Sequence, residues 1–315
     1  MEWYFILLII IGGILLITLL LYPFILSYIL YAIHMVKTKK TKWIRDCSSY
    51  KNEEQVKMWN DGLDYIKQYK DKIEPVDIYN GKLHLFGEFV NINAKKTVII
   101  MGGRCECLYY SYYYAKPYLE NDVNVLVIDS RAHGLSDGKI NTAGFKEADD
   151  LLCWVKFIHD KYNQEEIYLQ GTCIGSATTI YLLSNPDCPS YVTKVVADSL
   201  FRTYYETFWY HMVELKRPTK PYIDITFTFY KWFGKVDAKN DGPIYRIDKL
   251  KENTKILFLQ SLEDKYVFKE HTLELYEKCN LKEKEYHFLK YGNHSHIRIN
   301  QVEEYDNYII DFIKK

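Results

Sequence analysis

The chain begins with one long apolar stretch and then alternates between short apolar runs and polar segments. Residues 3–36 include no side chain that is formally charged at neutral pH, and this length exceeds the roughly 20 apolar residues that a membrane-spanning helix requires. We therefore expect residues 1–36 to form one transmembrane anchor. Pro23 should kink this helix or mark its end, and Tyr28 and Tyr31 should lie at a membrane interface.

A cleaved signal peptide is the alternative interpretation of this stretch. Its opening residues Met1 and Glu2 lack the basic n-region of a signal peptide, and no small-residue cleavage site closes the stretch. A basic flank follows directly, formed by Lys37, Lys39, Lys40, Lys42 and Arg45. Because the positive-inside rule keeps such a flank in the cytoplasm, we expect a single-pass membrane protein whose remaining chain is cytoplasmic.

An amphipathic segment joins the anchor to the rest of the chain. Residues 37–75 contain the basic flank and then a polar helix, expected over residues 52–72. The apolar side chains of this helix share one face: Met58, Trp59, Leu63 and Ile66. We interpret it as a spacer helix that rests on the following domain.

Residues 76–315 have the pattern of a single α/β domain. Apolar strands are expected at residues 77–79, 82–90 and 97–101, and strands and helices then alternate to the end of the chain. Such alternation predicts a mostly parallel sheet with helices on both faces. At about residues 200–250 the alternation gives way to aromatic-rich segments, which we expect to form a small cap insertion. The cap aromatics either line a pocket or form a small core of their own.

A cysteine stands at the sharpest predicted turn of this domain. The sequence predicts a short buried strand at residues 167–170 and a helix at residues 176–183, with Gly171 and Gly175 flanking Cys173 between them. Small neighbours let strand and helix approach closely, so that a nucleophile on such an elbow stands exposed above the sheet. A free cysteine beside glycines is also a common feature of protein cores. The rest of the sequence must therefore distinguish a nucleophile from a buried core cysteine.

Downstream of Cys173, an aspartate and then a histidine each follow a predicted strand. This is the chain order of nucleophile, acid and base. Asp264 lies in the loop after an apolar strand at residues 255–260, and His294 lies in the loop after a strand at residues 285–289. The carboxyl ends of parallel strands meet at one edge of a sheet, where active sites lie. We expect Cys173, Asp264 and His294 to converge there as nucleophile, acid and base.

Several neighbouring residues have simpler interpretations. Asp129 and Asp198 also follow strands, and we expect them to hydrogen-bond the backbone of the turn. His296 is expected on the surface or at the rim of a pocket. The five tyrosines in residues 109–114 are too dense for one helical face, so some should be exposed or should contact the cap or lipid headgroups.

Several motifs match one known family. Residues 125–138 give a strand and an R-x-H-G-x-S-x-G loop, residues 144–155 give the next helix, and residues 196–199 give the strand after the nucleophile helix. In these motifs the chain resembles the membrane-anchored α/β-hydrolases of the Bem46-like type. The resemblance implies the α/β-hydrolase fold and a structural role for His133.

The same resemblance bears on the candidate triad. It runs from Asp77 to the end of the chain, and the spacing to the last helix implies that His294, rather than His296, is the catalytic base. The chain departs from the family in two places, because the family usually has serine where this chain has Cys173 and His-Gly where it has Met101-Gly102. Dienelactone hydrolases, another branch of the fold, use a cysteine in G-x-C-x-G, so the cysteine is compatible with activity.

The resemblance also predicts an oxyanion hole and an activity. Its donors would be the backbone N–H groups of Gly103 and of Ile174, the residue after the nucleophile. With Cys173 activated by His294, such a site would cleave carboxylic esters, thioesters or lactones through an acyl-enzyme. We expect a small-molecule or lipid-like acyl substrate. The alternative is a catalytically silent fold that serves as a membrane-tethered binding or scaffold protein.

The charge and cysteine content of the chain limit which partners and cofactors we expect. Lys and Arg total 41, as do Asp and Glu, so the formal net charge is zero and nothing favours nucleic acid as a partner. The seven cysteines are an odd number scattered along the chain, which favours free thiols in a reducing compartment. Cys105 and Cys107 are too close in sequence for a standard zinc half-site. We expect no metal and no cofactor.

Overall fold

The computed structural model describes residues 3–315, and its centre is an eight-stranded sheet with the order β1-β2-β4-β3-β5-β6-β7-β8. Strands β3 to β8 run parallel, whereas β2 pairs antiparallel with both β1 and β4. The bounds are β1 (Ile73–Asn80), β2 (Leu83–Val90), β3 (Lys96–Met101), β4 (Val123–Ile128), β5 (Glu166–Thr172), β6 (Val192–Asp198), β7 (Lys255–Ser261) and β8 (Lys284–Leu289). The predicted mostly parallel sheet is confirmed.

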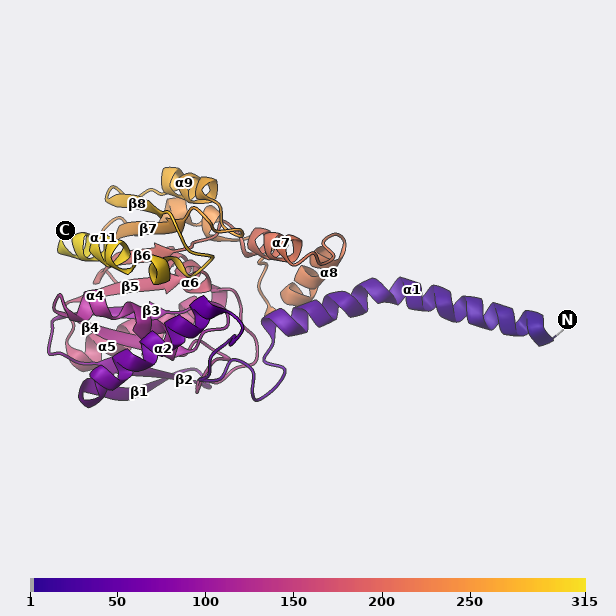
Figure 1. Cartoon of the computed structure of the whole chain (residues 1–315), viewed down its shortest axis with the longest axis horizontal. Coiled ribbons are helices and arrows are strands. Elements are labelled where there is room, and N and C mark those ends of the chain that lie inside the picture. The colour runs from indigo at the N-terminus through magenta and orange to yellow at the C-terminus, as the bar shows by residue number, and fades with distance from the viewer. Residues whose placement is uncertain (1–2) are drawn as a thin grey trace.

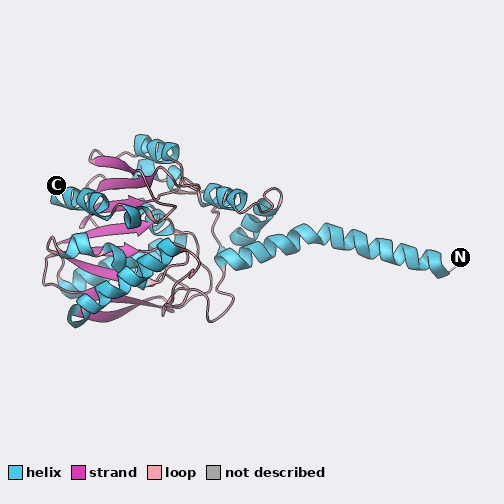
Figure 2. Ribbon diagram, viewed as in Figure 1, coloured by secondary structure: helices cyan, strands magenta, loops and turns pink. Residues whose placement is uncertain are grey.

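Helices cover both faces of this sheet (Figure 2). One face carries α5 (Phe145–Tyr162), α6 (Ile174–Leu183) and α9 (Lys269–Lys278). The other carries α2 (Glu53–Gln68), α3 (Leu108–Ser111), α4 (Lys116–Leu119), α10 (Ile297–Asn300) and α11 (Val302–Lys314). Alternate side chains of a strand point to opposite faces. In β3, Ile99 and Met101 therefore pack into the first layer, and Val98 and Ile100 into the second.

Short helical turns complete the connections between these elements. Four are 3-10 helices and one is a π-helix: η1 (Lys70–Lys72), η2 (Tyr112–Tyr114), η4 (Pro243–Tyr245), η5 (Ile247–Lys249) and the π-helical η3 (Tyr230–Gly234). The predicted spacer helix corresponds to α2 followed by η1, and it packs with Met58 and Trp59 buried.

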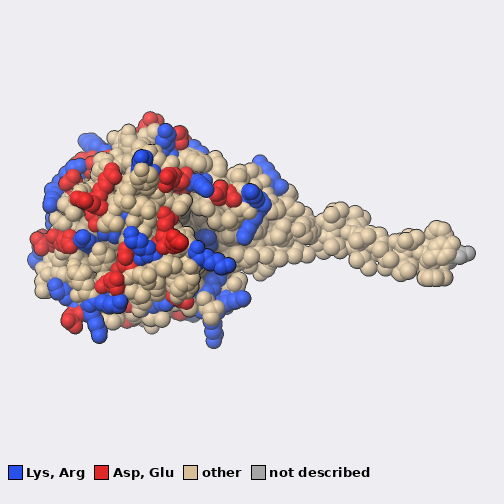
Figure 3. All heavy atoms as spheres, viewed as in Figure 1, with Lys and Arg blue, Asp and Glu red and all other residues tan. Residues whose placement is uncertain are grey.

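The N-terminal helix α1 (Trp3–Met35) projects away from the domain (Figure 1). It has 33 residues, and a rise of 1.5 Å per residue gives about 50 Å, more than the roughly 30 Å of a bilayer's hydrocarbon core. The helix continues through Pro23, and its outer part is exposed and tan in Figure 3, without charged side chains. Within residues 3–315, it is the one helix long and apolar enough to cross a membrane.

The predicted cap insertion consists of α7 (Tyr204–Glu214) and α8 (Tyr222–Phe229), which lie between the sheet and α1 (Figure 1). The last turns of α1 pack on α8 and bury Ser27, Leu30, Tyr31, His34 and Met35. Ser27 Oγ donates to Tyr222 O (2.9 Å), and Thr226 Oγ1 donates to Ser27 O (3.1 Å). Hydrogen bonds as well as apolar contacts therefore join α1 to α8.

Tyr31 lies in this contact rather than at a membrane interface. Its side chain is 2% exposed, and its ring centroid lies 6.2 Å from that of Tyr230 and 5.8 Å from that of Phe233. The prediction for Tyr31 was wrong because the cap, roughly two hundred residues later in the sequence, folds back over the end of α1. Tyr28 remains 49% exposed.

The dense tyrosine segment is part of the core. Tyr110, Tyr112, Tyr113 and Tyr114 are at most 1% exposed, Tyr112 Oη donates to a Glu88 carboxylate oxygen (2.8 Å), and other rings of the segment pack against α2. The prediction of exposure or of contacts with cap and lipid was wrong for these four tyrosines. Because α2 covers the segment on one side and the sheet on the other, more than one face of its short helices is buried.

Candidate functional site

Cys173 lies on a strained turn between a strand and a helix. β5 ends at Thr172 and α6 begins at Ile174. Cys173 has a φ of 55° and a ψ of −109°, a conformation that residues other than glycine rarely adopt and that is found mainly at functional sites. Its backbone N–H donates to Asp198 O at the end of β6 (3.0 Å), which ties the turn to the neighbouring strand.

Close packing explains the glycines on either side of Cys173. A Cβ atom on Gly175 would collide with the carbonyl oxygen of Met101, and one on Gly171 would collide with the backbone of Gly175. Backbone atoms cannot move aside as a flexible side chain can. The two glycines therefore allow α6 to begin directly over the end of β3, which leaves the Cys173 side chain at the carboxyl edge of the sheet.

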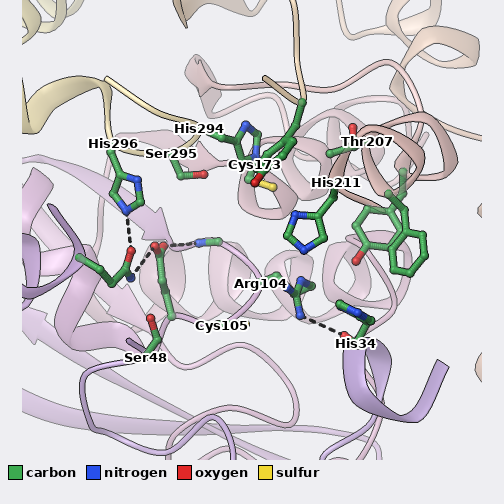
Figure 4. A pocket seen from close by; sticks show the side chains of 16 residues that line it. His34, Ser48, Arg104, Cys105, Cys173, Thr207, His211, His294, Ser295 and His296 are labelled. Atoms are coloured by element: carbon green, nitrogen blue, oxygen red, sulfur yellow. Dashed lines mark hydrogen bonds between the residues drawn. The ribbon is translucent and has the colours of Figure 1, made fainter. Parts of the chain in front are cut away.

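His294 and Asp264 meet at this edge. His294 Nδ1 lies 2.7 Å from Asp264 Oδ2, and the other carboxylate oxygen of Asp264 accepts the backbone N–H groups of Tyr266 (2.8 Å) and Val267 (2.9 Å). His294 Nε2 is buried and has no hydrogen-bond partner in residues 3–315. Figure 4 places the His294 ring next to Cys173, and the two residues line one cavity of about 180 Å³.

The charges of this group favour an imidazolium. Burial acts to lower the pKa of His294, but the Asp264 carboxylate and the Cys173 sulfur outweigh it and raise that pKa well above its ordinary value. Burial acts to raise the pKa of Asp264, but the charge and hydrogen bond of His294 outweigh it and hold that pKa below its ordinary value. The arrangement therefore suits a group that holds a proton beside a sulfur nucleophile.

The other two aspartates that follow strands lie outside this group. Asp129 accepts the backbone N–H of Leu135 in the turn after β4 (3.0 Å), which confirms its prediction. It also accepts the N–H of Leu108 at the start of α3 (2.8 Å) and the Nε–H of Arg45 (3.1 Å). The prediction for Asp198 was wrong, because its carboxylate accepts the hydroxyls of Ser199 (2.7 Å) and Tyr305 (2.8 Å) rather than turn backbone. Burial raises the pKa of Asp198 to about 6. Asp264, not Asp198, is the carboxylate that bonds His294.

The two expected oxyanion donors differ in their surroundings. Ile174 is the first residue of α6, so its N–H has no acceptor within the helix. The N–H of Gly103 donates to Glu106 Oε2 (2.6 Å), and a carboxylate therefore occupies the donor that we expected to be free. Glu106 is 8% exposed and lines the same cavity as Cys173.

Glu106 is held by Gln55, which sequence reasoning did not assign to the site, and Gln55 is held in turn by His296, which we expected on the surface or at the rim of a pocket. Gln55 Nε2 in α2 donates to Glu106 Oε1 (3.3 Å), and His296 Nε2 donates to Gln55 Oε1 (2.5 Å). His296 is 8% exposed and lines the cavity, and burial holds its pKa below the ordinary value. The linker helix thus contributes to the site through contacts between residues 241 positions apart, which no local pattern reveals.

The opposite wall comes from the end of α1, from α7 and from the loops after β3 and β7. Its residues include His34, Arg104, Tyr204, Phe208, His211 and Tyr266. The ring centroid of His34 lies 5.0 Å from that of Phe208 and 5.9 Å from that of His211. Burial, together with the charge of Arg104, lowers the pKa of His211 to about 4. A signal for His34 was available, since it is the only histidine in the apolar stretch.

Comparison with known proteins agrees with this architecture. The family described as "alpha/beta hydrolase fold" matches residues 96–222, which run from β3 through the Cys173 turn into α8. The uncharacterized protein YqkD of Bacillus subtilis (strain 168) is 30% identical over 221 residues, which cover 68% of this chain and 72% of that protein.

Solved structures share the fold as well. The Pyrococcus furiosus esterase Pf2001 superposes with a TM-score of 0.65 at 24% identity, over 79% of this chain and 93% of the esterase. A second crystal form of it gives a TM-score of 0.63 at 25% identity, over 79% and 94% of the two chains. The Pyrococcus horikoshii acylaminoacyl peptidase gives 0.55 at 16% identity, over 81% of this chain and 43% of the peptidase. The sheet order, the turn at Cys173 and these matches together show that the chain belongs to the alpha/beta hydrolase fold family.

Proposed function

We propose that this protein is a membrane-tethered acyl hydrolase of the Bem46-like type that uses Cys173 as nucleophile, His294 as base and Asp264 as the acid that orients His294. The observation that carries the proposal is the 2.7 Å contact of His294 Nδ1 with Asp264 Oδ2, beside a cysteine on a positive-φ turn. The three residues follow β5, β7 and β8, whose carboxyl ends share one edge of the sheet, and a triad requires its three side chains to lie together in this way.

The proposed reaction proceeds through an acyl-enzyme. The Cys173 thiolate attacks the acyl carbonyl carbon, and the carbonyl π electrons move to oxygen, which the N–H groups of Gly103 and Ile174 stabilise. Collapse of this intermediate breaks the bond to the leaving group, which takes the proton of the His294 imidazolium. His294 then removes a proton from water, the hydroxide attacks the thioester, and a second collapse releases the acid and restores the thiolate.

Leaving-group chemistry narrows the substrate class. A thiolate is a better leaving group than an amide nitrogen, so an intermediate formed from an amide returns to reactants more readily than it goes forward. Carboxylic esters, thioesters and lactones are therefore the proposed substrates. The cavity of about 180 Å³ accommodates a small acyl group or the reacting end of a larger lipid-like molecule.

We also propose that residues 1–36 anchor the protein, that residues 37–75 form a flank and linker, and that residues 76–315 form a cytoplasmic hydrolase domain. Supporting contacts come from Lys42, whose ammonium donates to the carbonyls of Ile33 (2.6 Å), Ala32 (3.2 Å) and Val36 at the end of α1. A cation at a helix C-terminus is favourable, and it keeps the basic flank beside the proposed membrane boundary. Protease added outside intact cells should leave residues 37–315 uncut.

One observation favours a second candidate, a catalytically silent binding or scaffold protein. The Gly103 N–H donates to the Glu106 carboxylate, and a negative charge at an oxyanion donor opposes the developing oxyanion. A chain that keeps Glu106 in this place during substrate binding would hold an acyl ligand without turning it over.

Hydrolysis assays separate the two candidates. The full chain in detergent micelles would be tested against p-nitrophenyl butyrate and butyryl-coenzyme A, beside Cys173→Ala and a matched control, Cys153→Ala in α5. The proposal predicts turnover that falls about a thousandfold or more in Cys173→Ala and stays near wild type in Cys153→Ala. Wild-type protein that binds acyl esters without releasing product would instead support the silent candidate.

A further inference from the structure

Arg104 is the one partly buried arginine that has no carboxylate partner within residues 3–315. Five of the seven arginines form ion pairs with Asp or Glu in residues 3–315: Arg45, Arg131, Arg202, Arg246 and Arg298. Of the remaining two, Arg217 is exposed to solvent, whereas Arg104 is half-buried in the wall of the Cys173 cavity. A cation withdrawn from water without a counterion is costly to the fold.

The contacts of Arg104 leave most of its guanidinium free. Its Nη1 donates to His34 O at the end of the anchor (3.4 Å), and its own carbonyl accepts the His133 ring (2.6 Å), which fixes the backbone. Figure 4 shows the side chain between His34 and His211, on the side of the cavity away from His296. Its other N–H groups have no hydrogen-bond acceptor within residues 3–315, and the residue lines the cavity.

Within residues 3–315, the carboxylates at the cavity bond groups other than Arg104. The Glu106 carboxylate is held by the Gly103 N–H and by Gln55, and Asp264 is committed to His294. His211 is neutral at pH 7, since burial and the charge of Arg104 lower its pKa to about 4. The cavity wall made by Arg104, His34 and His211 thus carries a net positive charge beside the Cys173 sulfur.

We infer that Arg104 binds a carboxylate or phosphate group of the substrate next to the acyl carbon that Cys173 attacks. A guanidinium presents several N–H donors in a plane and pairs with both oxygens of such an anion. Because Arg104 directly follows Gly103, the bound anion and the scissile carbonyl are held by adjacent residues of one loop. This inference rests on the proposed function and narrows its substrates to acyl compounds that carry an anionic group.

A matched pair of esters tests the inference. Mono-p-nitrophenyl succinate and p-nitrophenyl butyrate share a leaving group and a chain length and differ in one carboxylate. For the full chain in detergent micelles, kcat/KM should be about tenfold to a hundredfold higher for the succinate ester, the range of one charge-assisted hydrogen bond. Arg104→Gln should abolish this preference and Arg104→Lys should keep part of it. Arg217→Gln, which removes the same charge from the exposed arginine, should leave the preference intact.

Binding measurements make the test independent of turnover. In Cys173→Ala, succinate or inorganic phosphate should raise the unfolding temperature, and the double variant with Arg104→Gln should lose this effect. Nanodiscs of phosphatidylglycerol, compared with phosphatidylcholine, distinguish an anionic lipid headgroup from a free anion as the source of the ligand. Turnover of both esters at equal kcat/KM, with no anion binding, would overturn the inference and leave the proposed hydrolase standing. Anion binding that depends on Arg104, without turnover of either ester, would support the site and refute the hydrolase.

Discussion

The carboxylate of Glu106 accepts a hydrogen bond of 2.6 Å from the backbone N–H of Gly103. This N–H group is one of the two donors that we propose for the oxyanion hole. An oxyanion that develops at this N–H would compete with a charge already present there. The proposed reaction therefore requires Glu106 to leave Gly103 when substrate binds. Gln55, which holds the other oxygen of Glu106 (3.3 Å), links this movement to helix α2.

Removal of the competing carboxylate should accelerate the reaction. One oxyanion donor contributes about a hundredfold or more to kcat, so we expect Glu106→Ala to raise kcat for p-nitrophenyl butyrate by about tenfold. Glu106→Gln, which keeps an oxygen acceptor without its charge, should give a smaller rise. Steady-state kinetics provide the measurement, and a fall in kcat in Glu106→Ala would assign Glu106 a positive role in the reaction.

The two neighbouring histidines should differ sharply in importance. His294→Ala removes the base beside Asp264 and should lower kcat by about a thousandfold or more. His296 bonds Gln55 rather than Asp264, so His296→Ala should change kcat by less than about tenfold. Equal losses in the two variants, or a larger loss in His296→Ala, would refute the assignment of the base.

The raised pKa of His294 predicts how its contribution to stability depends on pH. The pKa of His294 in the folded protein lies above its unfolded value of about 6.5. Protonated His294 therefore stabilises the fold fully at pH values below about 6.5, and this stabilisation is lost as the pH rises through the folded pKa. The difference in unfolding free energy between wild type and His294→Gln should therefore shrink as the pH rises above neutrality. Thermal unfolding at a series of pH values measures it. A difference that grows with pH would show that His294 is neutral in the fold.

Two deletions of different length should separate the anchor from the site. Removal of residues 1–26 takes away the part of α1 that precedes its first fully buried side chain, Ser27, so the protein should leave the membrane fraction and keep its activity. Removal of residues 1–36 also takes away Leu30, Tyr31, His34 and Met35, which pack on the cap or line the cavity. This longer deletion should lower the unfolding temperature by several degrees and reduce activity. Membrane fractionation, thermal unfolding and ester hydrolysis would be measured for both deletion variants. Equal unfolding temperatures and activities in the two variants would contradict the packing role of the last turns of α1.

The sequence predicted the features that local patterns determine. The strand, glycine, cysteine and helix around Cys173 give an elbow because the two glycines are needed for close packing at any such turn. Asp264 and His294 could be placed because each follows a strand of one parallel sheet, and such strand ends share an edge.

The rest of the site depends on contacts between distant segments. Gln55 reaches His296 only because α2 packs across the sheet, and His34 reaches the cavity only because the cap holds the end of α1. The unpaired state of Arg104 is likewise a property of its surroundings, since no spacing of residues reveals which carboxylates lie within reach. Tertiary packing decides such contacts, and a single sequence carries no local sign of it.

Competitive alkylation tests the central claim most directly, because the cavity holds two thiols. Cys105 also lines it and is more exposed than Cys173, which is 7% exposed, and Cys153 is partly exposed on α5. Reaction governed by access alone would label Cys105 or Cys153 first, whereas a thiolate beside His294 and the N-terminus of α6 should react ahead of both.

The measurement is a time course of iodoacetamide labelling of the full chain, read residue by residue by mass spectrometry and compared with the remaining ester hydrolysis. The account predicts that Cys173 is alkylated before the other six cysteines and that activity disappears in step with this modification. Labelling of Cys105 or Cys153 first, with activity retained while Cys173 stays unmodified, would contradict it.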